Sequence, residues 1–246
     1  MAKHFGLTRI TRLSGVRALA GIGVIAGAAA LVGCNLDNSL TATGGPQGLV
    51  QFINAAPRYR FVNLSVDSTN AVPGQAYGSG TSVYVNALTN ARQLTVRDSA
   101  NATTLATSPL QVTDQSVYMA ILTQHATGGN LLIFPDTASP APGTAVGLRV
   151  INASPSAGNV DVYITGADST LTTPNATNVV FEGTSGYLYP VNGGVLRLRL
   201  TVAGTKTVLL DVDASTLTPG QIRSILLLDA VGGGLPATWL AVPDRG

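Results

Sequence analysis

The sequence predicts an all-β protein made of two tandem antiparallel, immunoglobulin-like β-sandwiches, and two observations carry this prediction. The first is composition. Of the 246 residues, 45% are hydrophobic, 11% are charged and 28 are glycine, which favours short strands and turns over helices. The second is an internal repeat, in which Val50–Pro57 (VQFINAAP) returns 98 positions later as Leu148–Pro155 (LRVINASP). A repeat spacing of 98 residues corresponds to the size of one sandwich domain and predicts two copies of it.

The first 33 residues have the pattern of a secretory signal peptide. Residues 1–17 are basic and contain no acidic residue, and the following apolar run ends at Leu31. This run is shorter than the roughly 20 residues that a membrane-spanning helix needs. The 14 basic residues of the chain include four in this leader, so the remainder is mildly acidic and lacks the basic surface that nucleic-acid binding needs.

The segment Leu31-Val-Gly-Cys34 resembles the lipobox of bacterial lipoproteins. That resemblance implies cleavage after Gly33 and acylation of Cys34 by fatty acids such as palmitate, which would anchor the protein to a membrane. In lipoproteins of bacteria with two membranes, an aspartate after the cysteine resembles a signal for retention in the inner membrane. The resemblance therefore implies the outer membrane, because this position is Asn35. The alternative is an ordinary cleaved signal followed by a coincidental cysteine.

The predicted organisation after residues 1–33 is a tether at 34–47, a first module at 48–136, a linker at 137–144 and a second module at 145–244. Segments 82–88 and 93–98 are predicted to form a hairpin. Residues 103–112 contain Pro109, which predicts an edge strand. Residues 196–202 alternate strictly, as in a strand with one buried face, whereas the run Ile225–Leu228 predicts a strand covered on both faces.

Asn152-Ala-Ser-Pro155, followed by Val160-Asp-Val-Tyr163, resembles the DUF4397 family, whose bacterial members are secreted or surface-anchored and have no known function. Phe181 and two short segments at 186–188 and 191–193 resemble the second block of the family. The resemblance covers nearly all of residues 48–244 and implies a divergent first copy, with Asn63 and Ser65 in place of Asp161 and Tyr163. We expect Asn152 to cap its turn by accepting backbone hydrogen bonds.

Candidate ligand-binding residues are few. Alternation places Asp161 and Tyr163 on one outer strand face, and Tyr187 and Tyr189 are the further candidates. The same pattern equally fits a solvated strand face. Arg197 and Arg199 share another exposed face, which is either solvated or in contact with an acidic ligand.

The residues needed for catalysis or metal binding are largely missing. His125 has no recognisable nucleophile in its sequence context, and Glu182 has no neighbouring carboxylate. Residues 211–215 lack the glycine and the final glutamate of a calcium loop. The sequence therefore predicts a non-catalytic envelope lipoprotein without cofactor or metal. Its role would be structural, adhesive or ligand-binding, and its partners, besides the membrane, an envelope protein or a glycan. The alternative is a pair of carbohydrate-binding modules.

Overall fold

The computed structural model describes residues 45–80, 84–138, 145–189, 196–212 and 220–244. All regular elements in these ranges are strands. The first half contains β1 (Gln47–Asn54), β2 (Phe61–Val66), β3 (Thr69–Ala76), β4 (Val85–Leu88), β5 (Asn90–Asp98), β6 (Thr104–Val112), β7 (Val117–Gln124) and β8 (Gly129–Pro135). The second half contains β9 (Gly147–Asn152), β10 (Val160–Gly166), β11 (Ala176–Val179), β12 (Thr184–Leu188), β13 (Leu196–Val202), β14 (Val208–Val212), β15 (Ile222–Leu228) and β16 (Thr238–Pro243).

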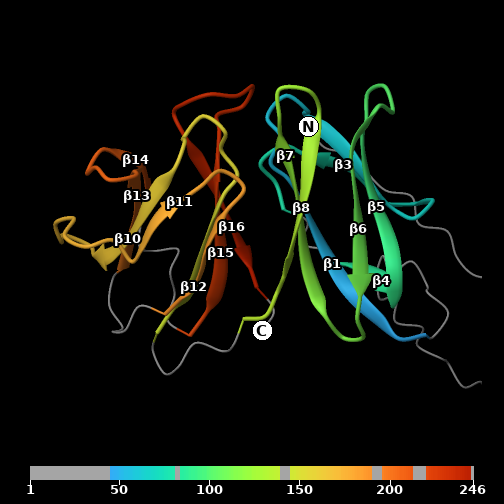
Figure 1. The fold of residues 1–246 in the computed structure, drawn as a ribbon, viewed down its shortest axis with the longest axis horizontal. Helices are drawn as coiled ribbons and strands as arrows, with labels where there is room; N and C mark the ends of the chain where they lie inside the picture. Colours follow the sequence, from blue (N-terminus) through green and yellow to red (C-terminus); the bar gives the residue numbers. More distant parts are fainter. Residues whose placement is uncertain (1–44, 81–83, 139–144, 190–195, 213–219, 245–246) are drawn as a thin grey trace, which may run out of the picture. The chain divides into compact units, whose positions relative to one another are not determined.

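The second set of strands repeats the topology of the first, strand for strand (Figure 1). In the first half, a sheet of order β4-β1-β7-β8 packs against a sheet of order β3-β2-β5-β6 around one apolar core. In the second half, β12-β9-β15-β16 and β11-β10-β13-β14 enclose a second core. The β-sandwich architecture predicted from the repeat is confirmed.

Two predictions about strand pairing were wrong. Each sandwich is mixed rather than antiparallel, because β1 runs parallel to β7 and β9 runs parallel to β15. The predicted hairpin of segments 82–88 and 93–98 does not form, because β4 pairs with β1 while β5 pairs with β2 and β6. The chain changes sheets at Thr89. Alternation of apolar residues shows which face of a strand is buried, but not which strand lies beside it or in which direction that strand runs.

A third apolar cluster joins the two halves. It contains Ile53 and Ile121 from the first half together with Ile151, Leu226 and Leu228 from the second, all at most 1% exposed. The central strands β1, β7, β9 and β15 are therefore covered on both faces. This confirms the prediction from the run Ile225–Leu228 and explains its lack of alternation. The described residues of both halves accordingly belong to one compact unit.

The structure also bears on the predicted edge strand and on the end of the predicted tether. Pro109 lies on β6, which is an edge strand as expected. The tether was predicted to reach residue 47, but Gln47 already belongs to β1, where its backbone N–H donates to Asp114. Cys34, and with it the predicted lipid anchor, lies outside the described residues. Within the described ranges, none of the elements is a helix long and apolar enough to cross a membrane.

Candidate functional site

The two motif asparagines have the same structural role in each half. Asn54 and Asn152 are fully buried and follow directly on the last apolar residue of β1 and β9. The Oδ1 of Asn54 accepts the Ala56 N–H at 3.1 Å, and that of Asn152 accepts the Ser154 N–H at 3.2 Å. These turns confirm the predicted capping role of Asn152. The repeated motif is therefore first of all a device that turns the chain at the end of a strand.

A second pair of equivalent contacts lies immediately after the motif prolines. Gln124, at the end of β7, accepts the backbone N–H of Arg58 through Oε1 at 3.0 Å. Asp229, just after β15, accepts the backbone N–H of Ser156 through Oδ1 at 3.3 Å. Because β7 and β15 occupy the same place in their sheets, each half fixes its motif turn with a polar side chain from the parallel neighbouring strand.

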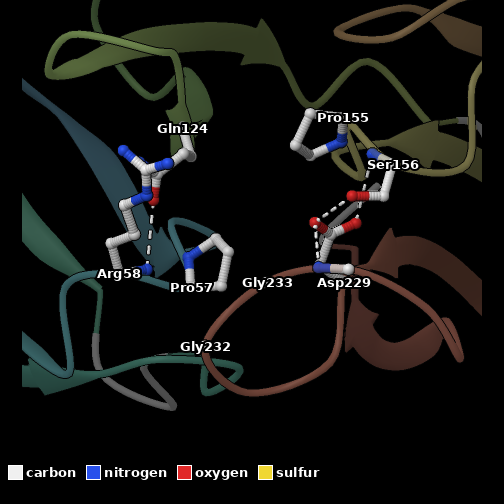
Figure 2. A pocket seen from close by; sticks show the side chains of 9 residues that line it. Pro57, Arg58, Gln124, Pro155, Ser156, Asp229, Gly232 and Gly233 are labelled. Carbon is white, nitrogen blue, oxygen red and sulfur yellow. Dashed lines mark hydrogen bonds between the residues drawn. The ribbon is translucent and has the colours of Figure 1, made fainter.

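These equivalent turns meet at the junction of the halves and enclose an open cavity of about 260 Å³. Figure 2 shows Pro57, Arg58 and Gln124 on one wall and Pro155, Ser156 and Asp229 on the other. The loop of Gly232–Gly234 also lines the cavity. Both copies of the motif that reveals the repeat in the sequence therefore contribute to the same cavity.

Asp229 is buried at the wall of this cavity, and all acceptor positions of its carboxylate are used. Its carboxylate accepts hydrogen bonds from the Ser154 hydroxyl, from the Ser156 hydroxyl at 2.8 Å and N–H at 3.3 Å, and from the Gly234 N–H at 2.9 Å. Its backbone carbonyl accepts the Tyr77 hydroxyl from the other half at 2.7 Å. Burial raises the pKa of Tyr77, so this hydroxyl stays protonated and remains a donor.

A carboxylate also links the halves beside the cavity. Glu182, from the second half, accepts the Thr123 hydroxyl at 2.5 Å and the Asn130 amide at 3.0 Å, and lies 2.8 Å from Nε2 of His125. Burial alone would raise the pKa of Glu182, but these three hydrogen bonds and the nearby imidazole hold it below its ordinary value. The charged carboxylate is thus favoured, and it stabilises the junction.

A buried ion pair within the second half lies at the opposite end of the junction. The Arg149 side chain is 4% exposed and that of Asp244 0%, with Nη2 and Oδ1 3.3 Å apart. Arg149 also donates to the Ser224 hydroxyl at 2.7 Å and to the Pro135 carbonyl of the first half at 3.3 Å. Its guanidinium lies 4.6 Å from the centre of the Tyr187 ring. One arginine thus connects both halves with the C-terminal end of β16.

Asp244 gives the protein a predictable pH dependence. Burial, opposed by Arg149 and assisted by Asp136, raises the pKa of Asp244 to about 6 from an ordinary 3.8. The folded state therefore binds a proton that the unfolded state has lost, and this contribution lowers the free energy of unfolding as pH rises from about 4 to about 6. Urea unfolding of the wild type and of Asp244→Asn should be compared from about pH 4 to above pH 7. As pH rises, the free energy of unfolding of the wild type should fall relative to that of the variant, and the difference should become constant above about pH 7. A difference that does not change with pH would contradict the assignment.

The structure does not support the predicted exposure of Asp161 and Tyr163. They are 5% and 2% exposed, whereas an open outer face was expected. Asp161 accepts the N–H groups of Asn178 and Gly204, both at 2.8 Å, and so ties β10 to two neighbouring segments. The Tyr163 ring lies 4.4 Å from the Lys206 ammonium, which donates to its hydroxyl. The alternation was interpreted correctly, but turns and long side chains cover that face.

The other candidates are also engaged. Tyr187 and Tyr189 are half-buried, and the Tyr187 hydroxyl donates to Asp136 at 3.1 Å. Tyr189 lies near Gly147, where an added Cβ would come within 3.1 Å of its ring. Arg197 pairs with Asp211, the first residue of the segment that was compared with a calcium loop. Arg199 donates to the Ser169 carbonyl at 2.5 Å. These polar side chains serve the fold.

Apart from the motif prolines Pro57 and Pro155, the residues that line the junction cavity were not predicted from the sequence. Arg58, Asp229 and the loop Gly232–Gly234 stand outside the motifs recognised in the sequence. A signal was nevertheless present, because both motif copies end in a proline followed by a polar residue, Arg58 in one and Ser156 in the other. Only the parallel strand pairs and the packing of the halves bring these turns together.

Comparison with protein-family models finds a match that spans the first half and the first two strands of the second. Residues 48–163 match the family model described as "Domain of unknown function (DUF4397)". The match begins where the first module was predicted to begin and ends at Tyr163 on β10, so it does not extend over the remainder of the second half. No curated protein sequence matches the chain.

Solved structures resemble the chain only distantly. One comes from work on α-glucan binding by a streptococcal virulence factor, with 10% identity over 73% of this chain and 92% of that chain, and a TM-score of 0.25. Another is a family CBM26 module of Amy13K from Eubacterium rectale in complex with maltoheptaose, with 11% identity, coverage of 81% and 98%, and a TM-score of 0.26. Similarity at this level does not define a ligand for this chain.

Proposed function

We propose that this protein is a non-catalytic, lipid-anchored protein of the bacterial cell envelope that acts by binding an envelope glycan or protein. The observation that carries the binding role is the junction cavity, since equivalent turns of both halves converge on it. Two β-sandwiches that share an apolar cluster and are linked by the hydrogen bond from Arg149 to the Pro135 carbonyl form a rigid support, and binding sites are commonly built from loops held by such a support.

The bonding of His125 favours binding over hydrolysis. Its Nε2 lies against Glu182, and its ring centre is 5.6 Å from that of Phe181. Thr123 carries a nearby hydroxyl, but this group is buried and donates to the same Glu182 carboxylate. A nucleophile activated by histidine would have to bond to the imidazole itself. The pairing therefore fits a structural junction better than an active site.

The second half supports the same role if it is a second DUF4397-like module. Its strand order repeats that of the first half, and its motif turn has equivalent hydrogen bonds. We include it in the proposal as the second copy of the module, which completes the junction. The tyrosine face needed by the alternative, a pair of carbohydrate-binding modules, lacks Tyr163, which is 2% exposed.

Replacing Cys34 with serine tests the anchor. We expect the wild-type protein to remain with membranes after a high-salt wash, because several acyl chains each contribute about 0.8 kcal/mol per buried methylene. The Cys34→Ser protein should move almost completely to the soluble fraction. Asn35→Ser serves as the matched control and should fractionate like the wild type. A Cys34→Ser protein that stays membrane-bound at high salt would refute the lipid anchor.

A further inference from the structure

Arg58 is the residue of the junction cavity with unused bonding capacity. Its backbone N–H is held by Gln124, and its side chain is exposed and lines the cavity (Figure 2). Among the described residues, none accepts a hydrogen bond from its guanidinium or pairs with it. The nearby Arg60 differs, since its guanidinium carbon lies 5.3 Å from the centre of the Phe61 ring. Arg58 therefore presents up to five N–H donors to whatever enters the cavity.

The opposite wall does not compete for that guanidinium. Each oxygen of Asp229 accepts two hydrogen bonds from its own half of the protein, which uses the roughly four acceptor positions of a carboxylate. Asp229 therefore has no acceptor position left for a cationic ligand. Ser156 lines the cavity, and its hydroxyl uses its proton on Asp229, so its oxygen can still accept a hydrogen bond. The unused capacity thus consists of a cationic donor and a neutral hydroxyl acceptor.

The cavity also restricts the size of a ligand. Its volume of about 260 Å³ is near the lower end for ligand sites, which suits one monosaccharide-sized group. The rings of Pro57 and Pro155 provide apolar surface on the two walls. Gly233 has a φ of 100°, a conformation that strains a residue with a side chain. A Cβ there would also lie 3.9 Å from Pro57 and 4.0 Å from Asp229. Glycine thus keeps the space between the walls open.

We propose that the junction cavity binds a hydroxyl-bearing carboxylate of monosaccharide size, such as a uronic acid unit, with Arg58 as the residue that holds the carboxylate. A planar guanidinium matches a carboxylate in a bidentate arrangement. The Ser156 oxygen would accept a ligand hydroxyl, and the two proline rings would contact the carbon skeleton. This inference rests on the binding role proposed above and names the chemistry of the ligand.

Saturation-transfer NMR on the full lipidated chain in detergent tests this site, with D-glucuronate as the probe. We expect saturable binding of D-glucuronate and no comparable binding of D-glucose, which lacks the carboxylate. Arg58→Gln should weaken glucuronate binding about tenfold or more, because a charge-assisted bidentate contact is lost. Arg60→Gln removes the same charge two residues away and should bind like the wild type.

Three outcomes would overturn the proposal. They are equal binding of glucose and glucuronate, unchanged affinity in Arg58→Gln, and displacement of glucuronate by equimolar inorganic phosphate as effectively as by D-galacturonate. The last result would indicate a general anion site without preference for carboxylates. Cys34-dependent fractionation is measured separately. A failed titration with intact fractionation would remove this ligand alone, whereas failed fractionation would remove the anchor whatever the titration shows.

Discussion

Replacing Leu226 with aspartate is expected to uncouple the two halves of the protein. Leu226 is fully buried in the cluster that both halves share, and a carboxylate there would lack a partner for its charge. In the wild type, unfolding followed by Trp239 fluorescence, which reports on the second half, should coincide with unfolding followed by circular dichroism. In Leu226→Asp the two transitions should separate, and the overall stability should fall by several kcal/mol.

The neighbouring residue provides the matched control. Leu227 is also fully buried, but it faces the second half's own core. Leu227→Ala should lower the free energy of unfolding by about 2–5 kcal/mol, as large-to-small core substitutions do, while the two probes still report one transition. Separate transitions in the wild type, or coincident ones in Leu226→Asp, would show that the shared cluster does not couple the halves.

Replacing Arg149 with alanine is expected to have the second large effect. The substitution would leave the Asp244 carboxylate, whose side chain is 0% exposed, without its cationic partner. Breaking a buried ion pair on one side costs about 3–5 kcal/mol. It would also remove the donors to Ser224 and to the Pro135 carbonyl. Urea denaturation at pH 7 should therefore show a greatly lowered midpoint.

Two further variants interpret that loss. Arg223→Ala removes a partly exposed arginine whose guanidinium, among the described residues, bonds to the nearby Gln221, and it should change stability by less than about 0.5 kcal/mol. The double variant Arg149→Ala with Asp244→Asn should lose less than the sum of the single variants, because the unpaired charge is gone. Strict additivity would mean that the pair does not interact in the folded state.

The candidate site shows how far residue patterns can be interpreted. Asp161 and Tyr163 were correctly assigned to the strand face opposite the core residue Val162. Their exposure was wrong, because Lys206 and the turn at Gly204 cover them. Coverage of an outer face depends on segments far away in the chain, which periodicity within one strand does not report. Arg58 was missed for the same reason, since its cavity forms from segments about 170 positions apart.

The fold class, the repeat and the central strands could be predicted from the sequence. Composition favoured strands over helices, the recurring Asn-Ala-x-Pro turn predicted two copies of one sandwich, and Ile225–Leu228 predicted a strand buried on both faces. These are local properties, encoded in side-chain chemistry and period. Three features emerge only in the tertiary structure. β1 runs parallel to β7 and β9 runs parallel to β15, both sandwiches share an apolar cluster, and their motif turns meet at one cavity. Strand neighbours and packed faces depend on the free energy of the whole chain, because each contact joins residues that are distant in the sequence.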